Sequence, residues 1–246
     1  MISTFRSLLP ALVLPVFLSQ CTGVFPGLLP PSRVTRMECL RTAESYRTHR
    51  WTPRHENVRH GADSKGIRID TPDISYHPAK AIPGWWVPGT ETVGVPYQWG
   101  GYSTLPEFDR GIREGKAAGD VYTDAKRAAL DDAVSADAVG IDCSGFISRC
   151  WKLPRSYSTR ELPLLCRSIG WDELKPGDIL NVHNAHCLLI ADWDGPNRER
   201  VLAYETGSPP TWKVVSHTIE VSWLKSLGYQ PYRYRGMQDS DSQPAR

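Results

Sequence analysis

The stretch Asp142-Cys143-Ser144-Gly145-Phe146 places a cysteine directly after an aspartate that is well suited to cap a helix. Apolar side chains follow at the spacing of one helix face and predict a helix that is buried on that side: Cys143, Phe146, Ile147, Cys150 and Trp151. Leu153-Pro154 predicts where this helix stops. The N–H groups at a helix N-terminus stabilise a thiolate, so Cys143 is a candidate nucleophile. The alternative is that Cys143 is a core cysteine without a chemical role.

A histidine directly precedes a predicted apolar strand further along the chain. His186 precedes Cys187-Leu188-Leu189-Ile190, a run that is typical of a buried strand. From this position its ring could take the thiol proton and return it to a leaving group, which favours thiolate catalysis. A core histidine is the alternative. A zinc site of His183, His186 and Cys187 is disfavoured, because paired Cys-x-x-Cys and His-x-x-x-His spacings are missing.

A third polar side chain usually fixes the orientation of such a histidine. The strand expected at Val201–Glu205 and the residue after it offer Tyr204, Glu205 and Thr206. A carboxylate hydrogen-bonded to the imidazole would fix its tautomer and favour its charged form, so Glu205 is the candidate. A solvent-facing strand glutamate is the alternative, and the side of the strand on which Glu205 lies decides between them.

Short apolar segments separated by turn residues follow the helix and predict an antiparallel sheet. They are Ile179–Val182, Cys187–Trp193, Val201–Glu205 and Lys213–Val221. A helix that precedes such a sheet indicates the α+β class. Two further helices are expected, one at Asp124–Val134 and one from Ser158 onward, where Glu161 completes a capping box.

The N-terminus has the pattern of an export signal. Arg6 precedes an apolar run from Leu8 to Leu18 that is too short to cross a bilayer. Leu18-Ser19-Gln20-Cys21 resembles a bacterial lipoprotein signal, although Gln20 stands where a small residue is usual. We therefore expect residues 1–21 to direct export to the periplasm or cell envelope, with a lipid on Cys21 as membrane anchor. Cleavage without lipidation, which releases a secreted chain, is the alternative.

Composition divides the rest of the chain into three parts. Residues 22–93 are expected to be a Pro- and Gly-rich tether, up to about residue 36, and an N-terminal extension of unknown role. Residues 94–236 form the predicted domain, with a mostly polar insert at 102–140, and residues 237–246 form a polar tail. A chain of 246 residues is long enough to bury one substantial hydrophobic core. Its net charge of +2 does not indicate a basic surface that binds nucleic acid. Its six cysteines allow disulfides in an exported protein.

Five segments, in sequence order, resemble the NlpC-type cell-wall peptidases, a bacterial family of papain-like cysteine peptidases. They are Pro96-Tyr97-Gln98-Trp99-Gly100-Gly101, Asp142-Cys143-Ser144-Gly145-Phe146, Leu153-Pro154-Arg155-Ser156, Leu174-Lys175-Pro176-Gly177-Asp178-Ile179-Leu180 and Ala185-His186 with its apolar strand. The resemblance covers about residues 94–236. It implies a papain-like fold, in which an N-terminal catalytic helix packs on an antiparallel β-sheet. It also implies hydrolysis of amide bonds in peptidoglycan stem peptides, often next to D-glutamate, by a Cys-His-polar triad that uses no metal or organic cofactor.

The same resemblance implies roles for further side chains. Tyr97 would assist at the nucleophile, and Trp99 in the aromatic-Gly-Gly segment would contact the substrate. Asp142 and Ser144, which flank the nucleophile, would help to recognise a free amino end of the stem peptide.

Three features depart from the family pattern. The insert at 102–140 is far longer than the usual link to the nucleophile, and we expect it to lie near the cleft as a lid or selectivity element. Cys187 and Leu188 replace the small residues that usually follow the histidine, and the third triad member is more often His, Asn or Gln than Glu.

Two other functions stay open at this point. A thiol-dependent amidase or acyltransferase that acts on another substrate would use the same side chains, and its products would distinguish it. A non-catalytic cell-wall-binding module would not need an intact Cys143 and His186, so it is disfavoured.

Overall fold

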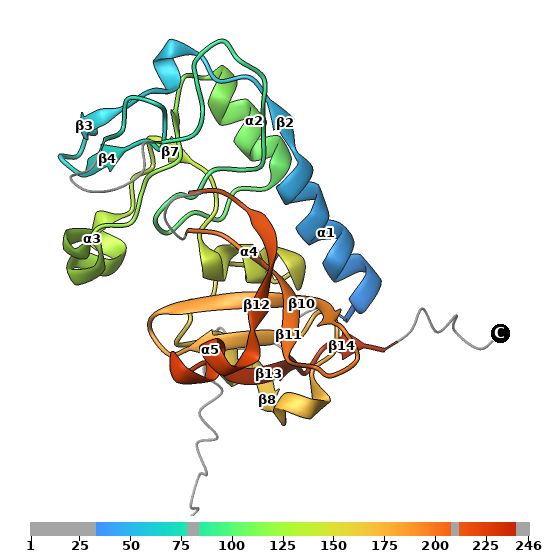
Figure 1. The fold of residues 1–246 in the computed structure, drawn as a ribbon. Helices are drawn as coiled ribbons and strands as arrows, with labels where there is room; N and C mark the ends of the chain where they lie inside the picture. Colours follow the sequence, from blue (N-terminus) through green and yellow to red (C-terminus); the bar gives the residue numbers. More distant parts are fainter. Residues whose placement is uncertain (1–32, 78–83, 208–211, 240–246) are drawn as a thin grey trace, which may run out of the picture.

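The computed structural model describes residues 33–77, 84–207 and 212–239 (Figure 1). The predicted export signal and Cys21 lie outside these residues, as do residues 22–32 of the predicted tether and residues 240–246 of the predicted tail. Within the described ranges, no helix is long and apolar enough to cross a membrane.

A six-stranded antiparallel sheet occupies the lower half of the molecule in Figure 1, and with the helices above it gives the predicted α+β class. Its strands, in spatial order, are β12 (Val215–Glu220), β11 (Arg200–Glu205), β10 (His186–Asp194), β9 (Ile179–Val182), β13 (Gln230–Tyr234) and β8 (Cys166–Ser168). All strands predicted between residues 179 and 221 are present. β12 begins two residues later than predicted, and it ends one residue earlier because helix α5 (Val221–Ser226) begins there.

Alternating side chains of the central strand β10 face two different cores. Cys187 and Leu189 belong to the larger cluster, on the side of the N-terminal helices. Leu188 and Ile190 belong to a second cluster, beneath α5 and the 3₁₀ turn η4 (Trp171–Glu173). Burial on both faces explains why this stretch is continuously apolar instead of alternating with polar residues.

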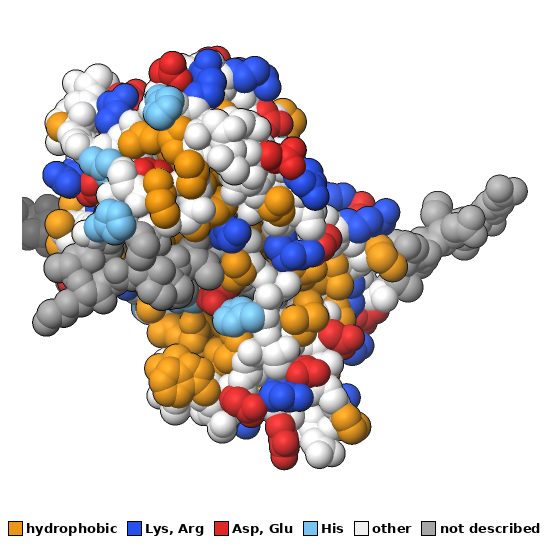
Figure 2. Space-filling view, turned by 45° about the horizontal axis from the view of Figure 1, so that its top comes forward, with side chains coloured by type: hydrophobic (Ala, Val, Ile, Leu, Met, Phe, Trp, Pro, Cys, Tyr) orange, Lys and Arg blue, Asp and Glu red, His pale blue; other side chains and the backbone are white. Residues whose placement is uncertain are grey.

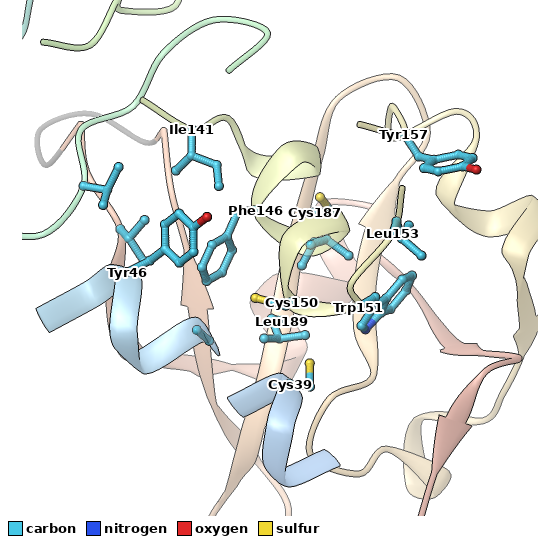
Figure 3. Close-up of a cluster of buried hydrophobic side chains, with 14 of the residues drawn as sticks. Cys39, Tyr46, Ile141, Phe146, Cys150, Trp151, Leu153, Tyr157, Cys187 and Leu189 are labelled. Carbon is cyan, nitrogen blue, oxygen red and sulfur yellow. The ribbon is translucent and has the colours of Figure 1, made fainter. Parts of the chain in front are cut away.

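Helix α4 (Cys143–Cys150) packs between this sheet and helix α1 (Arg36–Thr48), as Figure 3 shows. Asp142 caps α4 as predicted, since its carboxylate accepts an N–H from the first turn. Phe146 meets the ring of Tyr46 edge to face, with ring centroids 6.0 Å apart. Four residues of the predicted apolar face are buried, namely Phe146, Ile147, Cys150 and Trp151, and Cys143 is half-buried. Ser144, Gly145 and Ser148 are buried as well, so burial extends beyond the predicted face.

The N-terminal extension is part of the same core as the predicted domain, contrary to the boundary expected at residue 94. Cys39, Ala43 and Tyr46 follow the spacing of one helix face along α1, and all three are buried. They share a cluster with Phe146 and Leu189. Residues on both sides of the expected boundary therefore build one hydrophobic core.

The two ends of the described chain pair with each other. β1 (Val34–Thr35) runs parallel to β14 (Met237–Gln238), and Val34 is fully buried. Thr35 then forms a capping box with Glu38 at the start of α1. Val34 and Thr35, which were predicted to belong to the tether, and Met237 and Gln238, which were predicted to belong to the tail, are therefore paired strand residues.

The rest of the extension and the insert build the upper part of the molecule in Figure 1. Their elements are β2 (Arg50–Trp51), η1 (His55–Asn57), β3 (His60–Ala62), β4 (Arg68–Asp70), β5 (Thr92–Val93), α2 (Leu105–Arg113), β6 (Ala117–Ala118), α3 (Asp124–Ala129), η2 (Leu130–Ala133) and β7 (Ala138–Val139). Phe108 packs edge to face on Trp51, with centroids 5.1 Å apart, so the insert contributes to the core and is less polar than expected. The helix predicted at 124–134 ends early, because Leu130 adopts a positive φ of 52°.

The helix predicted from Ser158 does not form. The carboxylate of Glu161 accepts the N–H and the hydroxyl of Ser158, both at 2.9 Å, as a capping box would require. Only a 3₁₀ helix, η3 (Leu162–Leu165), follows. Pro163 has no N–H to donate to the carbonyl four residues earlier, and this carbonyl accepts from the side-chain amide of Asn181 at 3.1 Å instead.

A buried carboxylate joins α1, the turn before β9 and strand β13. Asp178 is fully buried and accepts from Nε and Nη2 of Arg233 at 2.9 and 2.6 Å. Nη1 of Arg36 donates to the same carboxylate at 3.1 Å, and the backbone N–H of Lys175 donates to it at 2.9 Å. Through Asp178, the Pro-Gly-Asp turn is therefore joined to α1 and to β13.

The surface carries mixed charge. Acidic and basic side chains are interspersed over the face shown in Figure 2. The five cysteines within the described residues are all free thiols.

Candidate active site

Cys143 lies at the N-terminus of α4 and lines a pocket of about 150 Å³. It is half-buried, whereas the other cysteines of the described ranges are buried. A Cβ on Gly145 would lie 2.1 Å from the carbonyl oxygen of Gly101, so only glycine allows this close approach. The N–H of Asp142 donates to that same carbonyl at 3.0 Å. The helix start is therefore fixed against the aromatic-Gly-Gly segment, and the position of the thiol is fixed with it.

His186, the first residue of β10, lies beside Cys143. A hydrogen bond from the Cys187 thiol lowers the pKa of Cys143 well below its ordinary value; burial opposes this shift, and the charge of His186 adds to it. Burial alone would lower the pKa of His186, but the Cys143 charge and hydrogen bonds to Cys143 and Glu205 raise it to about 10. These opposite shifts favour a thiolate–imidazolium pair at neutral pH.

The side chain of Glu205 faces His186. The sequence alone did not determine on which side of its strand Glu205 lies. Its Oε2 lies 2.9 Å from Nε2 of His186, so Nδ1 is the ring nitrogen available to the thiol. Burial would raise the pKa of Glu205, but hydrogen bonds from His186 and His217 lower it to about 2. Glu205 is therefore an ionised carboxylate that fixes the ring and stabilises its positive charge.

A second histidine, His217 of β12, extends this chain of side chains and was not predicted from the sequence. Its Nε2 lies 2.6 Å from Oε1 of Glu205, and the hydrogen bond raises the pKa of His217. His217 is the register partner of Ala203, and Glu205 lies two residues further along β11, so both side chains face the same side of the sheet. Only the register between β11 and β12 could have identified this contact.

Replacing Glu205 by alanine is expected to lower kcat/KM about 10- to 100-fold, because the imidazolium loses one charge-assisted hydrogen bond. Replacing it by glutamine keeps a hydrogen-bond acceptor and should recover part of the loss. His217→Ala leaves the His186–Glu205 contact in place, so a smaller loss is expected. Steady-state kinetics of the three variants check this order, and a wild-type rate for Glu205→Ala would assign the orienting role to another residue.

Tyr97 reaches the pocket from the aromatic-Gly-Gly segment. Burial, together with the nearby charges of Cys143 and Asp142, raises the pKa of Tyr97 well above its ordinary value, so its phenol stays protonated. A Cβ on Gly207 would lie 2.5 Å from the Tyr97 ring, so the glycine lets the segment after Glu205 pass close to the ring. Tyr97 can act at the pocket as an O–H donor.

Asp142 and Ser144, predicted to contact substrate, both line the pocket. The Ser144 hydroxyl donates to Oδ1 of Asp142 at 3.0 Å, and the same oxygen accepts the N–H of Gly145. Burial, followed by the neighbouring Cys143 charge, raises the pKa of Asp142 to about 7. Asp142 is therefore a helix cap as well as a polar group of the pocket wall.

The insert forms one wall of the pocket, as expected from its length and position. Its lining residues are Tyr122, Arg127, Leu130, Asp131 and Val134. Trp99, the third residue predicted to contact substrate, donates its indole N–H to the carbonyl of Leu130 at 3.0 Å. Its ring lies 5.8 Å from that of Tyr122. Aromatic packing and a hydrogen bond therefore hold this wall in place.

Cys187 contacts the candidate nucleophile, and the sequence did not predict this contact. It is buried, and its thiol hydrogen-bonds to Cys143. Burial raises the pKa of Cys187 well above its ordinary value, so this thiol stays protonated and donates to the thiolate. The position that departs from the pattern of the resemblance therefore contacts the sulfur of the candidate nucleophile.

Comparison of the chain with protein-family models gives no match, and comparisons with curated proteins and with solved structures give none either.

Proposed function

We propose that this protein is a papain-like cysteine peptidase of the NlpC type, exported to the cell envelope, that hydrolyses amide bonds in peptidoglycan stem peptides. The proposal is carried by one observation: Cys143, at the start of α4, meets His186, whose ring is fixed by Glu205. The packing of α4 on an antiparallel sheet supports the papain-like assignment. The export pattern that ends at Cys21 supports the location and a lipid anchor.

The first chemical step forms a thioester. The thiolate of Cys143 attacks the carbonyl carbon of the amide, and the π electrons of the carbonyl move to its oxygen. The N–H of Gly145 is already used by Asp142, so the N–H of Cys143 itself is the group at the helix start that we assign to the oxyanion. The C–N bond then breaks, and the imidazolium of His186 gives its proton to the leaving amine.

The second step hydrolyses the thioester. Neutral His186 takes a proton from water as the water oxygen attacks the carbonyl carbon. The C–S bond breaks, the acid product leaves, and the thiolate–imidazolium pair is restored. Glu205 stabilises the imidazolium before the first step and after the second, which is why its ionised state matters.

Turnover is expected to have a broad pH range. It rises as Cys143 loses its proton, well below the ordinary thiol pKa, and falls as His186 loses its proton near pH 10. Alkylation of Cys143 by iodoacetamide needs only the thiolate, so it should stay on its plateau above pH 10 while turnover falls. Asp142 titrates near pH 7, so Asp142→Asn should remove any inflection there. If the alkylation rate and the turnover rate both fell over the same alkaline pH range, the role assigned to His186 would be wrong.

The function is tested with defined stem peptides, tri- and tetrapeptides with and without a free amino end, and products are identified by mass spectrometry. New amino and carboxyl ends at one amide bond are the expected result. Transfer of the acyl group to an added amine in place of water would establish the acyltransferase instead. A folded protein whose Cys143 does not react with iodoacetamide would leave the wall-binding module as the function.

A further inference from the structure

Two arginines line the pocket that contains Cys143. Arg127 comes from α3 in the insert, and Arg160 comes from the segment between α4 and η3. Among the described residues, neither guanidinium has an ion pair or a side-chain hydrogen bond. Arg149 and Arg155, on the same part of the chain as Arg160, differ: Arg149 donates to the carbonyl of Tyr102 at 2.9 Å, and Arg155 pairs with Glu161 at 2.8 Å.

The acidic groups of the pocket do not neutralise these arginines. Asp131 is exposed and lies four residues after Arg127, beyond the end of α3, and no ion pair joins them. Asp142 is engaged with Ser144 and the helix start, and its carboxyl has a pKa of about 7. The pocket therefore offers two guanidinium groups with unused hydrogen-bond donors near the nucleophile.

Arg127 is placed by rigid surroundings. The preceding residue, Lys126, is buried and forms an ion pair with the buried Asp120. The next turn is fixed by the hydrogen bond from Trp99 to Leu130, at 3.0 Å. A side chain on a preformed wall loses less conformational freedom when it binds a ligand than one on an unconstrained loop.

We propose that Arg127 and Arg160 bind a carboxylate of the substrate, so that the enzyme selects stem peptides with a free carboxylate beside the cleaved amide. A guanidinium matches a carboxylate with two parallel N–H donors, and such charge-assisted pairs are stronger than neutral ones. The inference rests on the proposed function, because it names the substrate class of the same site. It gives the long insert a role in selectivity.

The first test compares two stem peptides that differ only in the α-carboxylate of glutamate, which is free in one and a carboxamide in the other. Wild-type enzyme is expected to prefer the free acid about 10- to 100-fold in kcat/KM. Arg127→Ala and Arg160→Ala should each reduce this preference, mainly through KM for the acid. Arg127→Lys keeps the charge without the paired donors and should recover only part of it. Arg200→Ala, which removes an exposed arginine paired with Asp194 at the other end of β11, is the matched control.

The second test needs no peptide substrate. Iodoacetate and iodoacetamide alkylate the same sulfur and differ in charge, and peptide mapping reports the reaction at Cys143 alone. Arg127→Ala is expected to lower the rate ratio of iodoacetate to iodoacetamide by about threefold or more, and added salt should shrink the ratio in the wild type.

The two tests separate the inference from the function on which it rests. A ratio that falls in Arg127→Ala, in a protein that cleaves no stem peptide, keeps the anion site and overturns the peptidase. Stem-peptide cleavage that does not discriminate between acid and amide, with an unchanged alkylation ratio, overturns the anion site and keeps the peptidase.

Discussion

Cys143→Ala is expected to abolish hydrolysis of stem peptides, with a loss of at least about four orders of magnitude in kcat. The thioester cannot form without the sulfur, and the oxyanion donor and His186 alone give little catalysis. Progress curves followed by mass spectrometry, over hours and at high enzyme concentration, measure the residual rate.

The control for this variant is Cys150→Ala. Cys150 lies on the same helix and is buried. Its replacement by alanine also removes one thiol from α4, so its effect on the helix should be similar to that of Cys143→Ala. This variant should keep activity and lose some stability through the cavity it leaves. Cys143→Ala should retain the wild-type circular dichroism spectrum. Hydrolysis by a clean preparation of folded Cys143→Ala would remove the proposed mechanism.

Asp178→Ala is expected to lower the free energy of unfolding by about 3–5 kcal/mol. The substitution leaves the mostly buried guanidinium group of Arg233 without its carboxylate. It leaves Arg36, which is also mostly buried, with only the exposed carboxylate of Asp239. Denaturant unfolding followed by tryptophan fluorescence measures the loss. In a chain of this size, the melting temperature should fall by roughly 6–20 °C.

Two variants sharpen this prediction. Asp178→Asn keeps one acceptor and should cost less than alanine. Glu91→Ala removes one partner of an exposed ion pair with Arg50, and a change of less than about 1 kcal/mol is expected. A similar small change for Asp178→Ala would mean that the buried cluster does not hold α1 to the sheet.

Local patterns predicted the centre of the fold well. The capping aspartate and the helical spacing of apolar residues predicted α4, and apolar runs between turns predicted the strands from β9 to β12. The position of α1 could not be predicted in this way. Its buried residues Cys39, Ala43 and Tyr46 stand among charged ones. The strand that precedes it, β1, pairs with β14, which lies about two hundred residues away in the sequence.

Residues of the candidate site could be predicted from the sequence where the residue type and its local context together indicate a chemical role. Cys143 at a helix start and His186 at a strand mouth are such cases, and the structure brings them together. Glu205 was one of three adjacent choices, and its selection depended on which side of the strand it faces. His217 has no local signal, because its contact with Glu205 depends on the register of two strands.

The parallel pairing of β1 with β14 has a mechanical consequence. Tension between residues 33 and 239 would pull these two strands in opposite directions along their length, which loads their hydrogen bonds in shear. The ion pair from Arg36 to Asp239, at 2.7 Å, reinforces the same junction. The junction must break before force reaches α4 or the sheet, so it acts as a clamp that keeps the pocket unstrained when the chain is pulled by its ends.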